Sequence, residues 1–313
     1  MIPERYFRSL PPDLTDTAYF HRLDRLRLTN VRRLRGVASG ERITRRMGVS
    51  IEFAGHRSYD PGDDLRYLDW NLLARLDTPY SKTFHEQEYF YTHVILDASG
   101  SMDGPRTNPK FAVARDVVTV LSYLILSGND RLRLACFPDV DAPYRLSGAH
   151  YHLGKRQMPA VRRFLSQTTA TGATWNDALI RYARENQRRL NRVYLITDAL
   201  APAEEIVANL EALTTGRGQV TLIRLIDASD RTFKPDQTQV NLKDRETGLE
   251  RLVTLDETNL KHYAAAFERH RATLIAFCAA RGAVYIELET NDFWYETLLE
   301  NTLFQRVAMR SGE

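Results

Sequence analysis

Short apolar runs alternate with amphipathic stretches along the last two thirds of the chain. The runs are rich in Val, Ile and Leu, which is typical of strands buried on both faces of a parallel sheet. The predicted strands are 91–96, 131–137, 192–197, 219–226 and 284–288, and the predicted helices are 110–127, 157–165, 176–190, 203–214, 259–281 and 293–309. This alternation predicts an α/β fold with an open, mainly parallel sheet flanked by helices.

Two segments depart from that alternation. Residues 239–243 and 249–253 flank the polar turn 244–248, so we expect an inserted β-hairpin within about 236–254. Residues 144–153 alternate weakly and predict a strand at the edge of the sheet. Both segments are additions to the regular strand and helix order.

The region before the sheet is organised differently. Residues 20–36 carry leucines at helical spacing with arginines between them, which predicts an amphipathic helix. Residues 55–70 are densely polar, and their four aspartates, Asp60, Asp63, Asp64 and Asp69, miss the spacing of a calcium loop. Pairing between arginine and aspartate side chains is the favoured explanation for this passage.

Charge and composition narrow the class of protein. The net charge is only +3, yet residues 1–60 hold twelve arginines against seven acidic residues. Such an arm can bind nucleic acid, an anionic membrane or an acidic protein. The lack of aromatic residues between Arg22 and Arg46 argues against stacking on the bases of single-stranded nucleic acid.

No apolar run in the sequence is long enough to cross a bilayer, and the N-terminal residues do not resemble a signal peptide, so we expect a cytoplasmic protein. Cys136 and Cys278 are expected to be buried thiols.

Oxygen-bearing side chains collect where predicted strands or loops lead into helices. Asp97, Ser99 and Ser101 follow the first strand, a hydroxyl-rich loop covers 168–174, and Asp198 ends the strand 192–197. Open α/β sheets bind ligands at the carboxyl ends of their strands, and such oxygens suit Mg²⁺. The two serines can instead cap a helix, and this alternative stays open. His150 and His152 share a strand face, but no third ligand lies near them in the sequence.

Together the three junctions resemble the metal-ion-dependent adhesion site (MIDAS) of a von Willebrand factor type A domain. Asp97-x-Ser99-x-Ser101 matches the opening motif of that family, and Thr197-Asp198 matches its last one. Gly172-Ala173-Thr174 is similar to the family's Gly-Gly-Thr, with Thr171 as a fallback for Thr174. The resemblance implies a Rossmann-like sheet. It also implies a divalent cation, Mg²⁺ first and Mn²⁺ or Ca²⁺ as alternatives, held by Asp97, Ser99, Ser101, Thr174 and Asp198.

A second resemblance covers residues 55–70. Their pattern GHRxYxPGDDxRxxDW resembles the signature of the bacterial family called domain of unknown function 58 (DUF58), in its short soluble form. The resemblance implies an N-terminal extension over 1–87 and a von Willebrand factor type A domain over 88–313. It also implies a MoxR-type AAA+ ATPase as partner, acting with the chain on an unknown client in protein remodelling or maturation.

We therefore expect a non-enzymatic adaptor that recognises a partner carboxylate through its cation. Ser99, Ser101 and Thr174 would contact the ion directly, and Asp97 and Asp198 directly or through water. One alternative is a metal-assisted hydrolase, although neither a well-placed general base nor a Gly-x-x-x-x-Gly-Lys loop is visible. Nucleic-acid binding through the arginine-rich arm and a purely structural scaffold are the others.

Overall fold

The computed structural model describes residues 23, 48–62, 64–104, 110–138, 144–170, 176–215, 218–231, 239–243, 249–254, 256–291 and 294–302, with the backbone alone at 48–54, 83–88, 176, 243 and 302. The chain divides into two compact units. One comprises Met1–Gly40 and Tyr91–Glu313, and the other comprises Glu41–Phe90.

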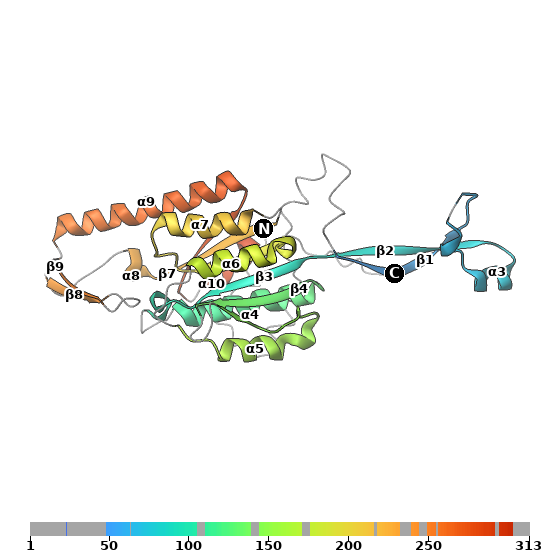
Figure 1. The fold of residues 1–313 in the computed structure, drawn as a ribbon, viewed down its shortest axis with the longest axis horizontal. Coiled ribbons are helices and arrows are strands. Elements are labelled where there is room, and N and C mark those ends of the chain that lie inside the picture. Colours follow the sequence, from blue (N-terminus) through green and yellow to red (C-terminus); the bar gives the residue numbers. More distant parts are fainter. Residues whose placement is uncertain are drawn as a thin grey trace. The chain divides into compact units, whose positions relative to one another are not determined.

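The larger unit is built on a six-stranded sheet with the order β10-β7-β6-β3-β4-β5 (Figure 1). Its strands are β3 (Tyr91–Asp97), β4 (Arg131–Phe137), β5 (Arg145–Leu146), β6 (Arg192–Thr197), β7 (Gln219–Ile226) and β10 (Val284–Glu289). All neighbouring pairs are parallel except β4 and the short edge strand β5. The chain is therefore a mixed α/β protein with a mainly parallel central sheet, as the alternation of elements predicts.

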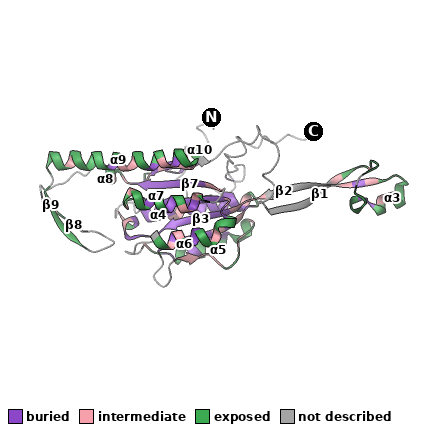
Figure 2. Ribbon diagram, turned by 45° about the horizontal axis from the view of Figure 1, so that its top comes forward, coloured by how far each residue is buried: buried purple, intermediate pink, exposed green. Residues whose placement is uncertain are grey.

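The central strands are apolar on both faces because each face packs against helices. Val94 and Leu96 of β3 belong to one buried cluster, whereas Ile95 between them belongs to another. This separation follows from the two-residue period of a strand, which turns alternate side chains to opposite faces. Figure 2 shows the strands as mostly buried. The buried side chain of Leu23, described alone in its region, joins the first cluster.

Among the described residues, three longer helices contribute to the buried cluster on each face of this sheet. The first cluster includes α4 (Lys110–Ser127), α5 (Met158–Ser166) and α10 (Trp294–Thr302). The second includes α6 (Asn176–Asn186), α7 (Ala203–Thr214) and α9 (Glu257–Arg281). Among the described residues, none of the helices combines the length and the apolar character needed to cross a membrane.

The smaller unit is a two-stranded antiparallel ribbon. Strand β1 (Gly48–Ser58) pairs with β2 (Tyr80–Tyr89), and a 3-10 turn η3 (Leu65–Tyr67) and a short helix α3 (Trp70–Leu76) lie between them. Arg66 pairs with Asp64 and Arg57 with Asp60, which confirms the predicted arginine–aspartate pairing. Asp69 accepts hydrogen bonds from the first backbone amides of α3, and His56 and Lys82 contact its carboxylate.

Several further predictions can be compared with the structure. The hairpin β8 (Gln239–Lys243) and β9 (Glu250–Thr254) is confirmed, and both cysteines are buried thiols as expected. The predicted edge strand over 144–153 shrinks to β5 and an isolated bridge between Leu132 and His152. Apart from Leu23, the predicted helix over 20–36 lies outside the described residues. The domain boundary after residue 87 stays a prediction.

Candidate metal site

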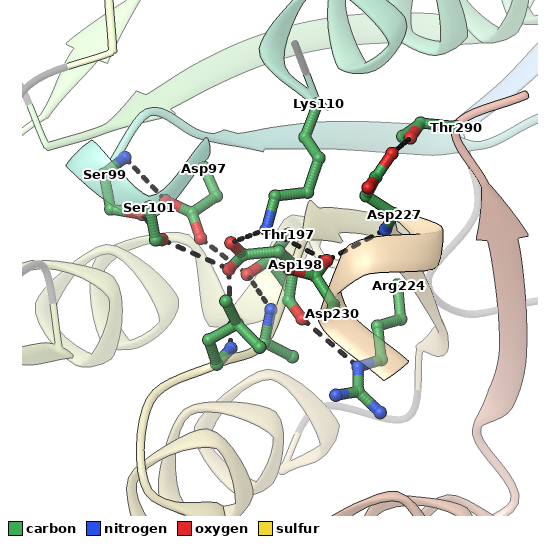
Figure 3. Close-up of polar contacts among 12 residues, drawn as sticks. Asp97, Ser99, Ser101, Lys110, Thr197, Asp198, Arg224, Asp227, Asp230 and Thr290 are labelled. Atoms are coloured by element: carbon green, nitrogen blue, oxygen red, sulfur yellow. Dashed lines mark hydrogen bonds and ion pairs between the residues drawn. The ribbon is translucent and has the colours of Figure 1, made fainter. Parts of the chain in front are cut away.

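The candidate site lies where β3 and β6 end side by side. Leu96 of β3 is opposite Ile196 of β6 in a parallel pair, so the residues that follow both strands emerge at one edge of the sheet. Asp97 ends β3 and leads into the 3-10 turn η4 (Gly100–Asp103), and Asp198 follows β6. Figure 3 shows the side chains of Asp97, Ser99, Ser101 and Asp198 turned toward one another.

Asp97 is almost fully buried and fixed by two hydrogen bonds. Its Oδ1 accepts from the Ser99 backbone N–H at 2.8 Å, and its Oδ2 accepts from the Thr197 hydroxyl at 2.5 Å. Burial, reinforced by the nearby charge of Asp198, raises the pKa of Asp97 to about 7. Both oxygens therefore already have partners within the chain.

The two serines face each other and the second aspartate. Ser99 Oγ lies 3.0 Å from Ser101 Oγ, and the Ser101 hydroxyl donates to Asp198 Oδ1 at 3.3 Å. Although Ser99 occupies the N-cap position of η4, its side chain makes no capping hydrogen bond. This geometry disfavours helix capping by Ser99 as the explanation for the motif.

A lysine that the sequence analysis did not single out enters the same cluster. Lys110, the first residue of α4, is 2% exposed, and its Nζ lies 2.8 Å from Asp198 Oδ2 and 3.3 Å from Asp230 Oδ2. Burial alone would lower the pKa of Lys110, but the charges of Asp198 and Asp230 outweigh it and raise the pKa. The amine is therefore held as an ammonium ion beside the candidate ligands.

A further contact supports Asp198 from β7, and Asp230, which contacts Lys110, belongs to α8 (Ala228–Arg231). The Arg224 guanidinium donates to the Asp198 carbonyl through Nε at 3.2 Å and packs 4.7 Å from the ring centroid of Phe267. The residue after Asp198, Ala199, has a φ of 50°, in the left-handed region that few residues other than glycine adopt. Asp198 therefore sits at a backbone bend held by buried contacts.

The profile of the family described as "Protein of unknown function DUF58" matches residues 55–273, which is more than half of the chain. The chain belongs to the DUF58 family. Uncharacterized proteins of Mycobacterium bovis and Mycobacterium tuberculosis are each 26% identical to this DUF58 protein over 304 residues, covering 96% of its chain and 94% of theirs.

Two solved structures are also similar to this DUF58 protein. Each is matched over 67% of the present chain. A conserved hypothetical protein, BatB, from Bacteroides thetaiotaomicron is 14% identical with a TM-score of 0.42, and 95% of it is covered. An aerotolerance-related membrane protein from Bacteroides fragilis is 17% identical with a TM-score of 0.38, and 96% of it is covered.

Four of the five predicted ligands of this DUF58 protein lie together. Asp97, Ser99, Ser101 and Asp198 converge, whereas Thr174, its fallback Thr171 and the residues between them lie outside the described part of the chain. Within that described part, no group of three His, Cys, Asp or Glu side chains is arranged to hold a metal. Two carboxylates with two hydroxyls nevertheless fit a hard cation such as Mg²⁺, because such ions accept neutral oxygen ligands.

His150 and His152 form no metal site with a third ligand within the described residues, in line with the lack of such a ligand near them in the sequence. His152 lies 3.0 Å from the Ser147 hydroxyl and 3.4 Å from Gln157 Oε1, while His150 is exposed. Sequence reasoning missed Lys110, Arg224 and Asp230, and it named Thr197 as part of a motif without giving it a contact. Arg224 carried a signal, since it is a charged residue within an apolar run that predicts a buried strand.

Proposed function

We propose that this protein is a non-enzymatic, metal-dependent protein-binding module whose larger unit is a von Willebrand factor type A domain. The observation that carries the proposal is the convergence of Asp97, Ser99, Ser101 and Asp198 at the carboxyl ends of two adjacent parallel strands. Ligand sites of open α/β sheets lie at that edge. Sequence similarity to the adhesion-site motifs supports Thr174 as the fifth ligand.

A divalent cation, Mg²⁺ first and Mn²⁺ or Ca²⁺ as alternatives, would supply an electrophilic contact for a carboxylate of the partner. Within the chain, the Ser99 and Ser101 hydroxyls suit direct contact because they add no negative charge. Both oxygens of Asp97 already accept hydrogen bonds, which favours contact through water. Asp198 Oδ1 faces Ser101 and is suited to either mode. Few formal charges in the ligand set favour binding of one more carboxylate.

The proposed partner is a MoxR-type AAA+ ATPase, with this chain as its adaptor or co-chaperone for a client protein. The choice of this partner is what the resemblance to DUF58 implies. Membership of the DUF58 family therefore supports the choice. Metal-assisted hydrolysis and nucleic-acid binding remain alternatives from different classes. A hydrolase would turn over phosphoester substrates in the presence of the metal. A nucleic-acid-binding protein would be retained on DNA in a way that weakens with added salt and persists in EDTA.

The test is retention of the MoxR-type ATPase from the same organism on the immobilised full chain. We expect retention in Mg²⁺, loss in EDTA, and loss in Mg²⁺ for Ser101→Ala, which removes one hydroxyl from the cluster. Ser166→Ala is the matched control, because its exposed hydroxyl donates to the Arg163 carbonyl within α5. Equal retention with EDTA, or by Ser101→Ala, contradicts the proposal.

A further inference from the structure

Lys110 shares one carboxylate with the candidate metal site. Its ammonium group lies against Asp198 Oδ2, while the other oxygen of the same carboxylate, Oδ1, faces the Ser101 hydroxyl (Figure 3). The side chains of Lys110 and Asp198 are 3% and 2% exposed, so water screens this contact poorly. A cation is therefore already present, as part of the chain, at the carboxylate that a divalent ion would use.

The same ammonium has a second anion within reach. Asp230 Oδ2 lies 3.3 Å from Lys110 Nζ and also accepts the Asp227 backbone N–H at 2.8 Å. The Asp230 carbonyl in turn accepts a hydrogen bond from the Tyr263 hydroxyl of α9 at 2.6 Å. Asp230 is thus held in place beside Lys110, so the ammonium keeps a partner even when its contact with Asp198 loosens.

We infer that Lys110 is a tethered cation that competes with the divalent ion for Asp198 and so sets the affinity of the site. Asp230 is the anion to which Lys110 turns when the ion binds. The inference rests on the proposed metal site and names the residues that regulate it. Two positive charges on one buried carboxylate repel each other, so ion binding must weaken the contact between Lys110 and Asp198.

The test is a titration of the metal-free full chain with Mn²⁺, in which free Mn²⁺ is measured by electron paramagnetic resonance. Lys110→Met should lower the dissociation constant about tenfold or more, because it removes the competing charge from a poorly screened site. Asp230→Asn should raise the dissociation constant. Of the two carboxylates that Lys110 contacts, Asp198 is then the one left, so the ion must compete with Lys110 more strongly. Lys261→Met is the control, since Lys261 is an exposed lysine paired with Glu257, and it should bind as wild type does.

The double variant Lys110→Met with Asp230→Asn tests whether Lys110 competes with the ion for Asp198 or affects Mn²⁺ binding only through the net charge of the protein. It keeps the wild-type net charge, and Asp198, which stays in place, loses the ammonium group that competes with the ion. Competition predicts tighter Mn²⁺ binding than wild type. Binding equal to or weaker than wild type overturns the inference, and it does so even if Lys110→Met alone does not fold.

The outcomes also separate this inference from the proposed function. If wild type binds Mn²⁺ and Ser101→Ala does not, the metal site stands, and the double variant alone decides the role of Lys110. If the double variant binds at millimolar Mn²⁺ and wild type does not, the role of Lys110 is supported and the metal-dependent function is contradicted. If none of the folded variants binds, both are overturned.

Discussion

The buried carboxyl group of Asp97 should make the metal-free protein less stable at alkaline pH, and Asp97→Asn should remove that effect. The folded chain raises the pKa of Asp97 from its ordinary value of 3.8 to about 7, chiefly through burial and then through the charge of Asp198. An amide has the same shape as the protonated carboxyl group and cannot ionise. The substitution therefore fixes this position in the form that the folded chain prefers.

The size of the effect follows from the two pKa values. Between pH 3.8 and about 7 the unfolded chain has released this proton while the folded chain retains it, so stability from this group falls as pH rises. A tenfold difference in proton affinity corresponds to about 1.4 kcal/mol. From pH 5 to pH 8, wild type should thus lose about 3 kcal/mol of unfolding free energy relative to Asp97→Asn.

Urea denaturation followed by far-UV circular dichroism, at pH 5 and pH 8 in EDTA, measures this difference. Comparing the two proteins at each pH cancels the contributions of other titrating groups. Asp60→Asn is the control, because it changes an exposed carboxylate paired with Arg57 and should follow the wild-type pH dependence. Parallel pH curves for wild type and Asp97→Asn would refute the reasoning. Mg²⁺ at pH 8 should then stabilise wild type more than Asp97→Asn.

Three further predictions concern the larger unit. Burial, with the charge of Arg133, lowers the pKa of His93 to about 3, so wild type should lose about 3 kcal/mol more than His93→Gln between pH 6.5 and pH 4 in denaturant titrations. Gly218→Ala would put a Cβ 1.7 Å from the Leu190 carbonyl oxygen and should cost about 2 kcal/mol or more, whereas Gly128→Ala, with 3.4 Å to its nearest atom, should be nearly neutral by the same assay. Arg192→Met leaves the Asp130 carboxylate, 2.9 Å from Arg192, without its buried cation and should cost about 3 kcal/mol, most of which Asp130→Asn should restore in thermal unfolding.

The central sheet could be predicted because its physical signal is local. Strands β3 and β6 need apolar side chains on both faces, and their runs of Val, Ile and Leu show this requirement in the sequence itself. Parallel strands put their carboxyl ends at one edge of the sheet, and the resemblance to the adhesion-site motifs selected Asp97 and Asp198 among the residues at those ends. Asp97, Ser99, Ser101 and Asp198 accordingly converge.

The ribbon of β1 and β2 carried a weaker signal. It is a separate two-stranded sheet, so neither strand needs the apolar pattern of one covered on both faces. Its pairing joins residues 22 to 41 positions apart, from Ser58 with Tyr80 to Gly48 with Tyr89. The arginine–aspartate pairs next to it, Arg57 with Asp60 and Arg66 with Asp64, could be expected from the sequence, but the register of the two strands could not.

The cluster around Lys110 depends on long-range contacts that no local pattern encodes. Lys110 begins an apolar helix and Asp230 lies in a polar segment after β7, and their contact spans 120 positions. The sheet order puts β7 next to β6, so α8, which follows β7, lies near the residues that follow β6, and Lys110 contacts both Asp198 and Asp230. A buried lysine therefore becomes predictable only after the topology is known.

The charges of Lys110 and Asp97 support one account of how the site would bind an ion. Ionising two buried aspartates side by side has a high free-energy cost unless positive charge lies beside them. In the chain itself, the ammonium of Lys110 neutralises Asp198, and the raised pKa of Asp97 favours a proton there. A divalent cation would supply two charges and so replace both. Ion binding should then release about one proton near pH 7 and detach Lys110 toward Asp230. The affinity of the proposed site is therefore expected to rise with pH and to depend on a lysine that is not one of its ligands.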